Sequence, residues 1–355
     1  MQKIKFLSNH SLLLAGLLTL ILLSPYCSQS PPPKPTPELM IWPPPPDIPR
    51  IQYITSLSSE EDLRGPRKRS LADILTGRDP NENVRRLYKP YGVCTDSKGR
   101  IYIADSGQGM VIVFDRDNKQ VSLIGNSGRG KLSWPIDIVI DNNDLIYVSD
   151  VRRASVYVFN PEGTFTNSLG ESGTFNNPAG MAFDSERERI LVVDSKAHKV
   201  LVFSNSGEFI TEFGERGVVE GQFNFPTNAA VGSDGYIYVA DTGNHRVQVF
   251  DKNYEYYDDF GSLGIHPGQF RRPKGISLDS ENNIYVVDSG FNNFQIFNQE
   301  YQILMPVGEY GRGQPGKFWL PAGIHIDEND FIYVVDSTNQ RVQIFKYLKQ
   351  DLPDQ

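Results

Sequence analysis

Short runs of alternating apolar and polar residues recur along most of the chain. Within residues 226–250 one run ends at Asp241, a polar turn follows, and a second run returns through Val247 and Val249 to Phe250. Alternation with a period of two is typical of half-buried β-strands. The stretch therefore predicts three short antiparallel strands.

This pattern recurs in six copies with a fixed register. A proline heads the first strand of each copy, an aspartate closes the second, and a phenylalanine ends the third. The three sets are Pro90, Pro135, Pro178, Pro226, Pro273 and Pro321; Asp105, Asp150, Asp194, Asp241, Asp288 and Asp336; and Phe114, Phe159, Phe203, Phe250, Phe297 and Phe345. The spacing of the prolines ranges from 43 residues (Pro135 to Pro178) to 48 (Pro178 to Pro226).

The repeat period indicates a β-propeller. A unit of about 40 to 50 residues with four short strands is typical of one propeller blade. The fourth strand is expected just before a glycine-rich loop, as in residues 208–213 before Gly214. One such sheet cannot bury both faces alone, so blades stack around an axis. We therefore predict an all-β fold, a six-bladed β-propeller over residues 87–346.

The two ends of the chain are expected to close the ring together. Residues 51–57 alternate like a strand but precede the first repeat, whereas the last repeat has no fourth strand in the tail at 347–355. Residues 48–58 are therefore predicted to supply the outer strand of blade six. The insertion at 59–86 contains the pattern of a short helix, from Ser70 to Gly77, expected to pack over one edge of the ring.

The amino terminus has the features of an export signal. Lys3 and Lys5 precede an apolar run from Leu12 to Leu23 that is short for a membrane span, so residues 1–26 are interpreted as a signal peptide. Cys27 follows, and residues 27–47 are a proline-rich, stiff tether. This arrangement resembles a bacterial lipoprotein lipidated at Cys27, with Ser28 favouring the outer membrane. Ordinary secretion and a retained signal anchor are the alternatives.

Charge and cysteine content narrow the class of partner. There are 43 acidic and 35 basic residues, a formal net charge of -8, so nucleic acid is not an expected partner. The two cysteines imply no disulfide framework. Cys94, in a predicted inner strand, is expected to be a small core side chain.

With these residues in view, the repeats resemble NHL repeats. The strings DTGNHRVQVF (241–250) and DSTNQRVQIF (336–345) fit the family pattern D-x-x-N-x-R-V-x-x-F, and the other blades match it less well. The resemblance covers roughly residues 85–346 and implies a six-bladed NHL propeller. It extends to exported bacterial NHL lipoproteins of unassigned role, and it implies no particular activity.

Candidate chemistry is sparse. The six repeated aspartates are expected to accept hydrogen bonds from turn amides rather than to form a catalytic ring. His198 and His245, four residues after their aspartates, are weak zinc candidates. Asp137 and Lys274 are unusual charged residues at strand heads, and Asp137 is a weak candidate for channel chemistry. No catalytic residue or cofactor is assigned, and the binding of a divalent metal ion is kept as an alternative.

The clearest signal is a separation of charge between the two faces. Loops that join the second and third strands share one face with the loops that join the blades. The candidate partner-binding residues on that face are Arg129, Lys131, Trp134, Arg152, Arg153, Lys196, Arg271, Arg272, Arg312 and Trp319. The opposite turns carry acidic residues, among them Asp141, Asp144, Glu186, Glu188, Asp279, Glu281, Glu328 and Asp330.

These features favour a membrane-tethered binding module of the cell envelope that acts as a monomer. Its basic loops are expected to receive a protein partner or an anionic envelope component. The alternative is a metal-dependent hydrolase or lyase with its site in the central channel.

Overall fold

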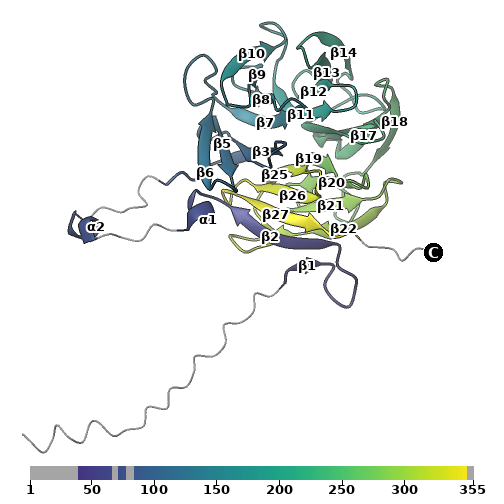
Figure 1. Ribbon diagram of the computed structural model, residues 1–355. Helices are drawn as coiled ribbons and strands as arrows, with labels where there is room; N and C mark the ends of the chain where they lie inside the picture. Colours follow the sequence, from purple (N-terminus) through teal and green to yellow (C-terminus); the bar gives the residue numbers. More distant parts are fainter. Residues whose placement is uncertain (1–38, 66–70, 77–83, 350–355) are drawn as a thin grey trace, which may run out of the picture. The chain divides into compact units, whose positions relative to one another are not determined.

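Six antiparallel sheets follow one another along the chain in the structure, a computed structural model that describes residues 39–65, 71–76 and 84–349. They form the blades of a propeller (Figure 1). Blade one contains β3 (Pro90–Thr95), β4 (Ile101–Asp105), β5 (Met110–Asp115) and β6 (Gln120–Ile124). Blade two contains β7 (Pro135–Ile140), β8 (Ile146–Asp150), β9 (Ser155–Phe159) and β10 (Phe165–Leu169). The predicted all-β, six-bladed fold is confirmed.

The remaining blades repeat the same order. Blade three contains β11 (Pro178–Asp184), β12 (Arg189–Asp194), β13 (Lys199–Ser204) and β14 (Phe209–Phe213), and blade four contains β15 (Asn228–Val231), β16 (Ile237–Asp241), β17 (Arg246–Phe250) and β18 (Tyr256–Phe260). Blade five contains β19 (Pro273–Leu278), β20 (Ile284–Asp288), β21 (Asn293–Phe297) and β22 (Ile303–Val307). Blade six begins with β25 (Pro321–Ile326), β26 (Phe331–Asp336) and β27 (Arg341–Tyr347).

The last blade is completed by the beginning of the described chain. Strand β2 (Ile51–Leu57) pairs antiparallel with β27, from Ile51 opposite Tyr347 to Leu57 opposite Val342. The predicted closing strand is therefore confirmed, and Figure 1 shows β2 beside β27. Because β2 covers an edge that would otherwise be open, closure ties the two ends of the propeller into one sheet.

A fifth strand on this blade was not predicted. Strand β1 (Ile41–Trp42) pairs with β2, and the Trp42 ring lies edge-on to Phe345 with the ring centroids 5.8 Å apart. The prediction that the whole of residues 27–47 is an extended spacer is wrong for β1, because Ile41 and Trp42 gain a strand partner and a core contact. Cys27 and the predicted signal peptide lie outside the described residues.

The hydrophobic core is divided among the contacts between neighbouring blades. Six clusters of buried side chains each combine residues of two adjacent blades, as when Phe294 of blade five meets Phe345 of blade six. The phenylalanine three residues before a blade's proline is fully buried at Phe223, Phe270 and Phe318. Burial of each of these phenylalanine side chains stabilises the propeller by roughly 2 to 3 kcal/mol.

Glycines in the linkers between the blades make room for these rings. Gly214 and Gly261 have φ angles of 87° and 88°, and a Cβ at either would lie within 2.4 Å of Phe223 or Phe270. Both the backbone conformation and the contact require glycine at these positions.

The insertion before blade one differs from the prediction in one respect. Helix α2 (Leu71–Thr76) lies within the predicted segment, and α1 (Glu61–Arg64) precedes it. Ile74 and Leu75 of α2 are exposed, so the expected packing of α2 over the edge of the ring is wrong. Neither of the helices in the described ranges has the length and apolar character that crossing a bilayer requires.

Truncation from the amino terminus tests the closure. A chain that starts at residue 59 lacks β2, which buries Ile51 and Leu57, so its melting temperature should fall by roughly 10 °C or more relative to a chain that starts at residue 39. A chain that starts at residue 48 keeps β2, loses only β1, and should fall much less. Equal melting of all three chains, measured by calorimetry, would show that closure does not stabilise the ring.

Candidate binding face and channel pocket

The repeated aspartates are structural, as predicted, and they do more than cap a turn. All six are fully buried. Asp288 accepts hydrogen bonds from the amides of Gly290 and Phe291 in the turn that follows it, and also from the amides of Arg271 and Arg272 in the linker before the blade. The bonds to the linker were not predicted. One carboxylate therefore holds two loops of the same face together.

The same arrangement in blade two fixes a second pair of arginines. Asp150 accepts hydrogen bonds from the amides of Arg152 and Arg153 at 3.1 and 3.0 Å, and from the amides of Ser133 and Trp134 in the preceding linker. Hydrogen bonds to a buried carboxylate are charge-assisted and strong. The backbone beneath these arginines is thus held rigidly while their side chains remain exposed.

We call the cations of these loops the basic loop face. Its members are exposed, and none forms an ion pair with another described residue: Arg129, Lys131, Arg152, Arg153, Lys196, Arg271, Arg272 and Arg312. Their charge is therefore not neutralised within the described part of the chain. An exposed, unpaired set of like charges is the electrostatic pattern of a surface that attracts anions.

The two tryptophans of this face hold cations in place. The Trp134 ring contacts both the Lys89 ammonium and the Arg152 guanidinium, whose distances to the ring centroid are 5.0 and 4.9 Å. The Arg312 guanidinium lies 4.3 Å from the Trp319 ring. Such contacts contribute about 0.5 to 1 kcal/mol each at exposed sites. The structure therefore joins the tryptophans and arginines that the sequence indicated separately.

The opposite turns are less acidic at the surface than predicted. Asp141, Asp279 and Asp330 are buried. Asp279 accepts bonds from turn amides and from the Tyr285 hydroxyl at 2.9 Å, and burial raises the pKa of its carboxyl. These aspartates therefore stabilise turns, and only the exposed residues of the predicted acidic set, such as Glu186 and Glu328, present their charge to solvent.

The inner strands carry a second feature, a ring of positions two residues after each proline. Four blades have glycine there, namely Gly92, Gly180, Gly275 and Gly323, whereas blades two and four have Asp137 and Asn228. A Cβ at Gly92 would lie 2.6 Å from Asp137 Oδ1, and one at Gly180 would lie 2.5 Å from Asn228 Cα. The glycines thus make room for the two polar side chains.

Asp137 links three blades. Its Oδ2 accepts a hydrogen bond from the Met181 amide at 2.8 Å and one from Asn228 Nδ2 at 3.1 Å. Burial raises the pKa of Asp137 to about 7. Asn228 was missed in the sequence, although its departure from glycine at this position could have shown it.

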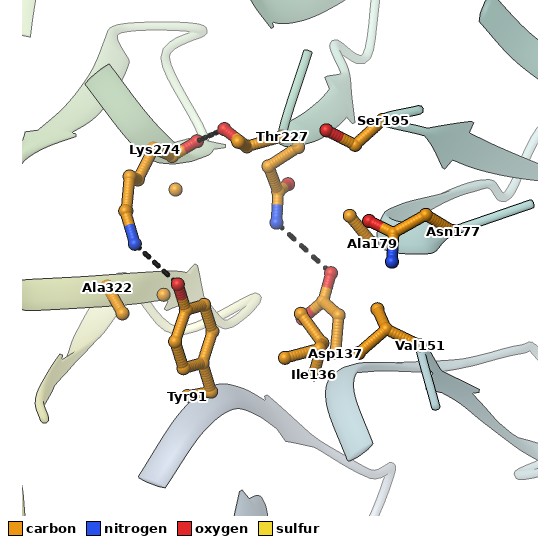
Figure 2. A pocket seen from close by; sticks show the side chains of 13 residues that line it. Tyr91, Ile136, Asp137, Val151, Asn177, Ala179, Ser195, Thr227, Lys274 and Ala322 are labelled. Carbon is orange, nitrogen blue, oxygen red and sulfur yellow. Dashed lines mark hydrogen bonds between the residues drawn. The ribbon is translucent and has the colours of Figure 1, made fainter. Parts of the chain in front are cut away.

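A cavity of about 200 Å³ lies at this end of the channel. Lys274 and Tyr91 line one side of it, where Lys274 Nζ donates a hydrogen bond to the Tyr91 hydroxyl, and Ser195 and Asn177 line another (Figure 2). The cavity is also lined by Val151 and Ser195, whose chain neighbours Arg152 and Lys196 belong to the basic loop face. The two charged strand heads noted in the sequence, Asp137 and Lys274, therefore meet in one pocket.

A second cavity of about 260 Å³ shares Asp137 and Asn228 with the first. Its lining is largely aliphatic, with Cys94 and His325 among it. Burial raises the pKa of the Cys94 thiol to about 12 and lowers the pKa of His325 to about 4, and His325 Nε2 lies 2.9 Å from Thr95 Oγ1. Both side chains are therefore neutral near pH 7, and Cys94 is a buried side chain as predicted.

The two weak zinc candidates contact the linkers instead. His198 Nδ1 lies 3.2 Å from the Phe225 amide nitrogen, and His245 Nδ1 donates to the Arg271 carbonyl oxygen at 3.0 Å. Each histidine thus supports the linker of the next blade. Among the described residues, no group of three or more His, Cys, Asp or Glu side chains is arranged to hold a metal ion.

Comparison with protein families agrees with the repeats. The NHL repeat model matches residues 223–250, 270–297 and 318–345, and a model described as a 6-bladed beta-propeller matches residues 132–213. The chain carries NHL repeats. Each matched NHL repeat begins at the linker phenylalanine and ends at the phenylalanine of the third strand. No curated protein matches the sequence.

Solved structures share the fold of this NHL propeller at low sequence identity. Virginiamycin B lyase from Staphylococcus aureus is 12% identical with a TM-score of 0.55, over 73% of this chain and 95% of that one. An auxiliary nutrient binding protein from Bacteroides thetaiotaomicron is 15% identical with a TM-score of 0.59, over 74% and 70%. A gluconolactonase from Xanthomonas campestris is 12% identical with a TM-score of 0.58, over 74% and 87%. These likenesses support the fold alone.

The pKa of Asp137 makes the stability of the NHL propeller depend on pH. Because the pKa of Asp137 is raised from 3.8 to about 7 in the folded state, its stabilising contribution is fully present below the unfolded pKa, falls as pH rises from there, and is lost once pH exceeds the folded pKa. Asp137→Asn removes this dependence. Between pH 5.5 and 8.5, the melting temperature of the wild type should therefore fall relative to that of Asp137→Asn, as measured by scanning fluorimetry.

Two comparisons isolate the effect. Asp258→Asn changes an exposed carboxylate and should follow the wild type. His325, whose pKa is lowered, contributes stability that is lost on acidification, but the contribution is the same in each protein and cancels in the difference. If the melting temperatures of the wild type and Asp137→Asn changed in parallel across this pH range, Asp137 would not titrate there.

Proposed function

We propose that this NHL propeller is a binding module that captures an acidic protein partner on its basic loop face. The observation that carries the proposal is the set of exposed cations without described ion-pair partners, four of which, Arg152, Arg153, Arg271 and Arg272, have their amides bonded to the buried Asp150 and Asp288. A rigid, unneutralised array keeps its charges in place before the partner arrives. Binding therefore costs less ordering entropy than it would on mobile loops.

Exposed apolar side chains on two of the linkers between blades favour a protein over a simple polyanion. Phe225 and Leu320 stand directly before their prolines, are 48% and 47% exposed, and have φ angles of 50° and 52°. Bulky residues seldom adopt this left-handed conformation. The Phe225 amide is held by His198 and the Leu320 amide by Asn292 Oδ1 at 2.8 Å. Arginine and aromatic anchors beside exposed apolar groups are typical of the centres of protein interfaces.

The proposal includes the cellular setting. Lys3 and Lys5 before the apolar run, Cys27 after it and the proline-rich segment beyond support an exported protein tethered to the cell envelope by a lipid. The partner would then be an envelope protein with an acidic surface. Nothing in the described residues specifically favours the alternative, a metal-dependent hydrolase or lyase in the channel.

Charge reversal on the face tests the proposal. Replacing Arg152, Arg153, Arg271 and Arg272 with Glu should reduce capture of acidic envelope proteins at least tenfold, because like charges then oppose each other across the interface. Capture is measured by quantitative mass spectrometry on immobilised protein. Binding by the wild type should also weaken between about 0.05 and 0.5 M salt.

A matched control separates the face from net charge. Reversing the exposed residues Lys98, Arg116, Lys119 and Lys252, which lie on other turns, changes the net charge equally. This control should retain capture. Unchanged capture by the first variant, or equal loss in both, would refute a role for the basic loop face.

A further inference from the structure

The first cavity of the channel, of about 200 Å³, is lined by polar residues that could bind a small molecule separately from the basic loop face. Of the residues that directly follow the six prolines, only Lys274 is charged, the others being Tyr91, Ile136, Ala179, Thr227 and Ala322. Lys274 forms no ion pair with a described residue. Its ammonium lies 4.7 Å from the centroid of the Tyr91 ring and donates to the Tyr91 hydroxyl.

This contact leaves donors for a ligand. An ammonium has three protons, so two remain when one is given to Tyr91. A Tyr91 hydroxyl that accepts from Lys274 still has its own proton to donate. The two residues come from blades five and one, and together they form a fixed pair of donors suited to the two oxygens of a carboxylate.

The other walls supply hydroxyl, amide and carboxyl groups. Figure 2 shows the Ser195 hydroxyl and the Asn177 amide across the pocket from Lys274, with Asp137 at the lower centre of the view. Asp137 is held by Asn228 and by the Met181 amide. Such groups match hydroxyls, which both donate and accept. A pocket with a cation on one wall and hydroxyl partners on the others suits a ligand that has both kinds of group.

The size of the cavity limits the ligand. A volume of about 200 Å³ equals that of about seven waters at about 30 Å³ each. A ligand on the order of seven non-hydrogen atoms fits within this volume. The surrounding basic loops would raise the local concentration of anions at the entrance.

We propose that this pocket binds a small hydroxycarboxylate, with its carboxylate between Lys274 and Tyr91 and its hydroxyl toward Ser195, Asn177 and Asp137. The site is independent of the proposed capture of a protein partner. It adds a specificity that the repeats do not encode, since Lys274, Tyr91, Asn177 and Asp137 each occur in one blade only at their positions, whereas a serine follows the repeated aspartate in four blades.

Ligand-induced stabilisation tests the site. Lactate, glycerate and malate at about 10 mM are the probes, with glycerol and propionate as the matched compounds that lack either the carboxylate or the hydroxyl. At least one hydroxycarboxylate should raise the melting temperature of the chain that starts at residue 39 by about 2 °C or more. Its affinity, measured by calorimetry, should fall at least tenfold in Lys274→Met.

Two further variants keep the test decisive. Lys252→Met changes an exposed lysine away from the channel and should bind like the wild type. Tyr91→Phe keeps the ring but removes the hydroxyl, so it should also weaken binding, and it replaces Lys274→Met in the test if that variant does not fold. The proposal is overturned if no hydroxycarboxylate stabilises the protein, if glycerol and propionate stabilise it equally, or if Lys274→Met or Tyr91→Phe binds unchanged. Because Lys274→Met leaves the basic loop face intact, capture of a protein partner by this variant would be unaffected in any of these cases.

Discussion

A buried carboxylate at the end of the second strand of every blade is the interaction on which the rest of the structure depends. Each one accepts a hydrogen bond from an amide of the linker that enters the blade, and in blades one, two, three and five it also accepts from amides of the following turn. Main-chain amides would otherwise lie unpaired beneath exposed loops, at a cost of about 1 to 3 kcal/mol each. The repeat thus specifies the blades and, through the same residue, the positions of the loops on one face.

The binding features are variations on this repeated frame. The basic loop face uses side chains that differ from blade to blade, while an aspartate common to all blades fixes the backbone of Arg152, Arg153, Arg271 and Arg272. In the channel, Asp137 and Asn228 replace glycine in a ring where their neighbours Gly92 and Gly180 leave space for them. Repetition therefore provides stability, and departures from it provide the candidate sites.

Much of the fold was predictable because strand alternation and the repeat period are local signals. The closing strand β2 was predictable because Ile51 to Leu57 alternate and the last repeat lacked a fourth strand. Strand β1 was not, because two residues carry no periodicity. The exposure of Ile74 and Leu75 in α2 was also not predictable, since a helical pattern does not state what the helix contacts.

The candidate site was predictable only in part. The charged residues Asp137 and Lys274 stood out at the strand heads, but their contacts with Asn228 and Tyr91 join blades that are distant in sequence. The cation and tryptophan contacts of Trp134 likewise depend on how neighbouring blades pack. Such contacts follow from ring closure, which the spacing of single residues does not reveal.

Hydrogen–deuterium exchange of Asp288→Asn tests most directly whether a buried aspartate holds the loops of the basic face. The substitution replaces either Oδ2, which accepts from the Arg271 amide, or Oδ1, which accepts from the amides of Arg272, Gly290 and Phe291, with a donor, and it removes the charge that strengthens all four bonds. Exchange in residues 271–272 and 290–291 should accelerate at least tenfold, while the inner strands of the opposite blades remain protected. Unchanged exchange in those linker and turn amides would contradict the account, because the loops would then be held by something other than the carboxylate.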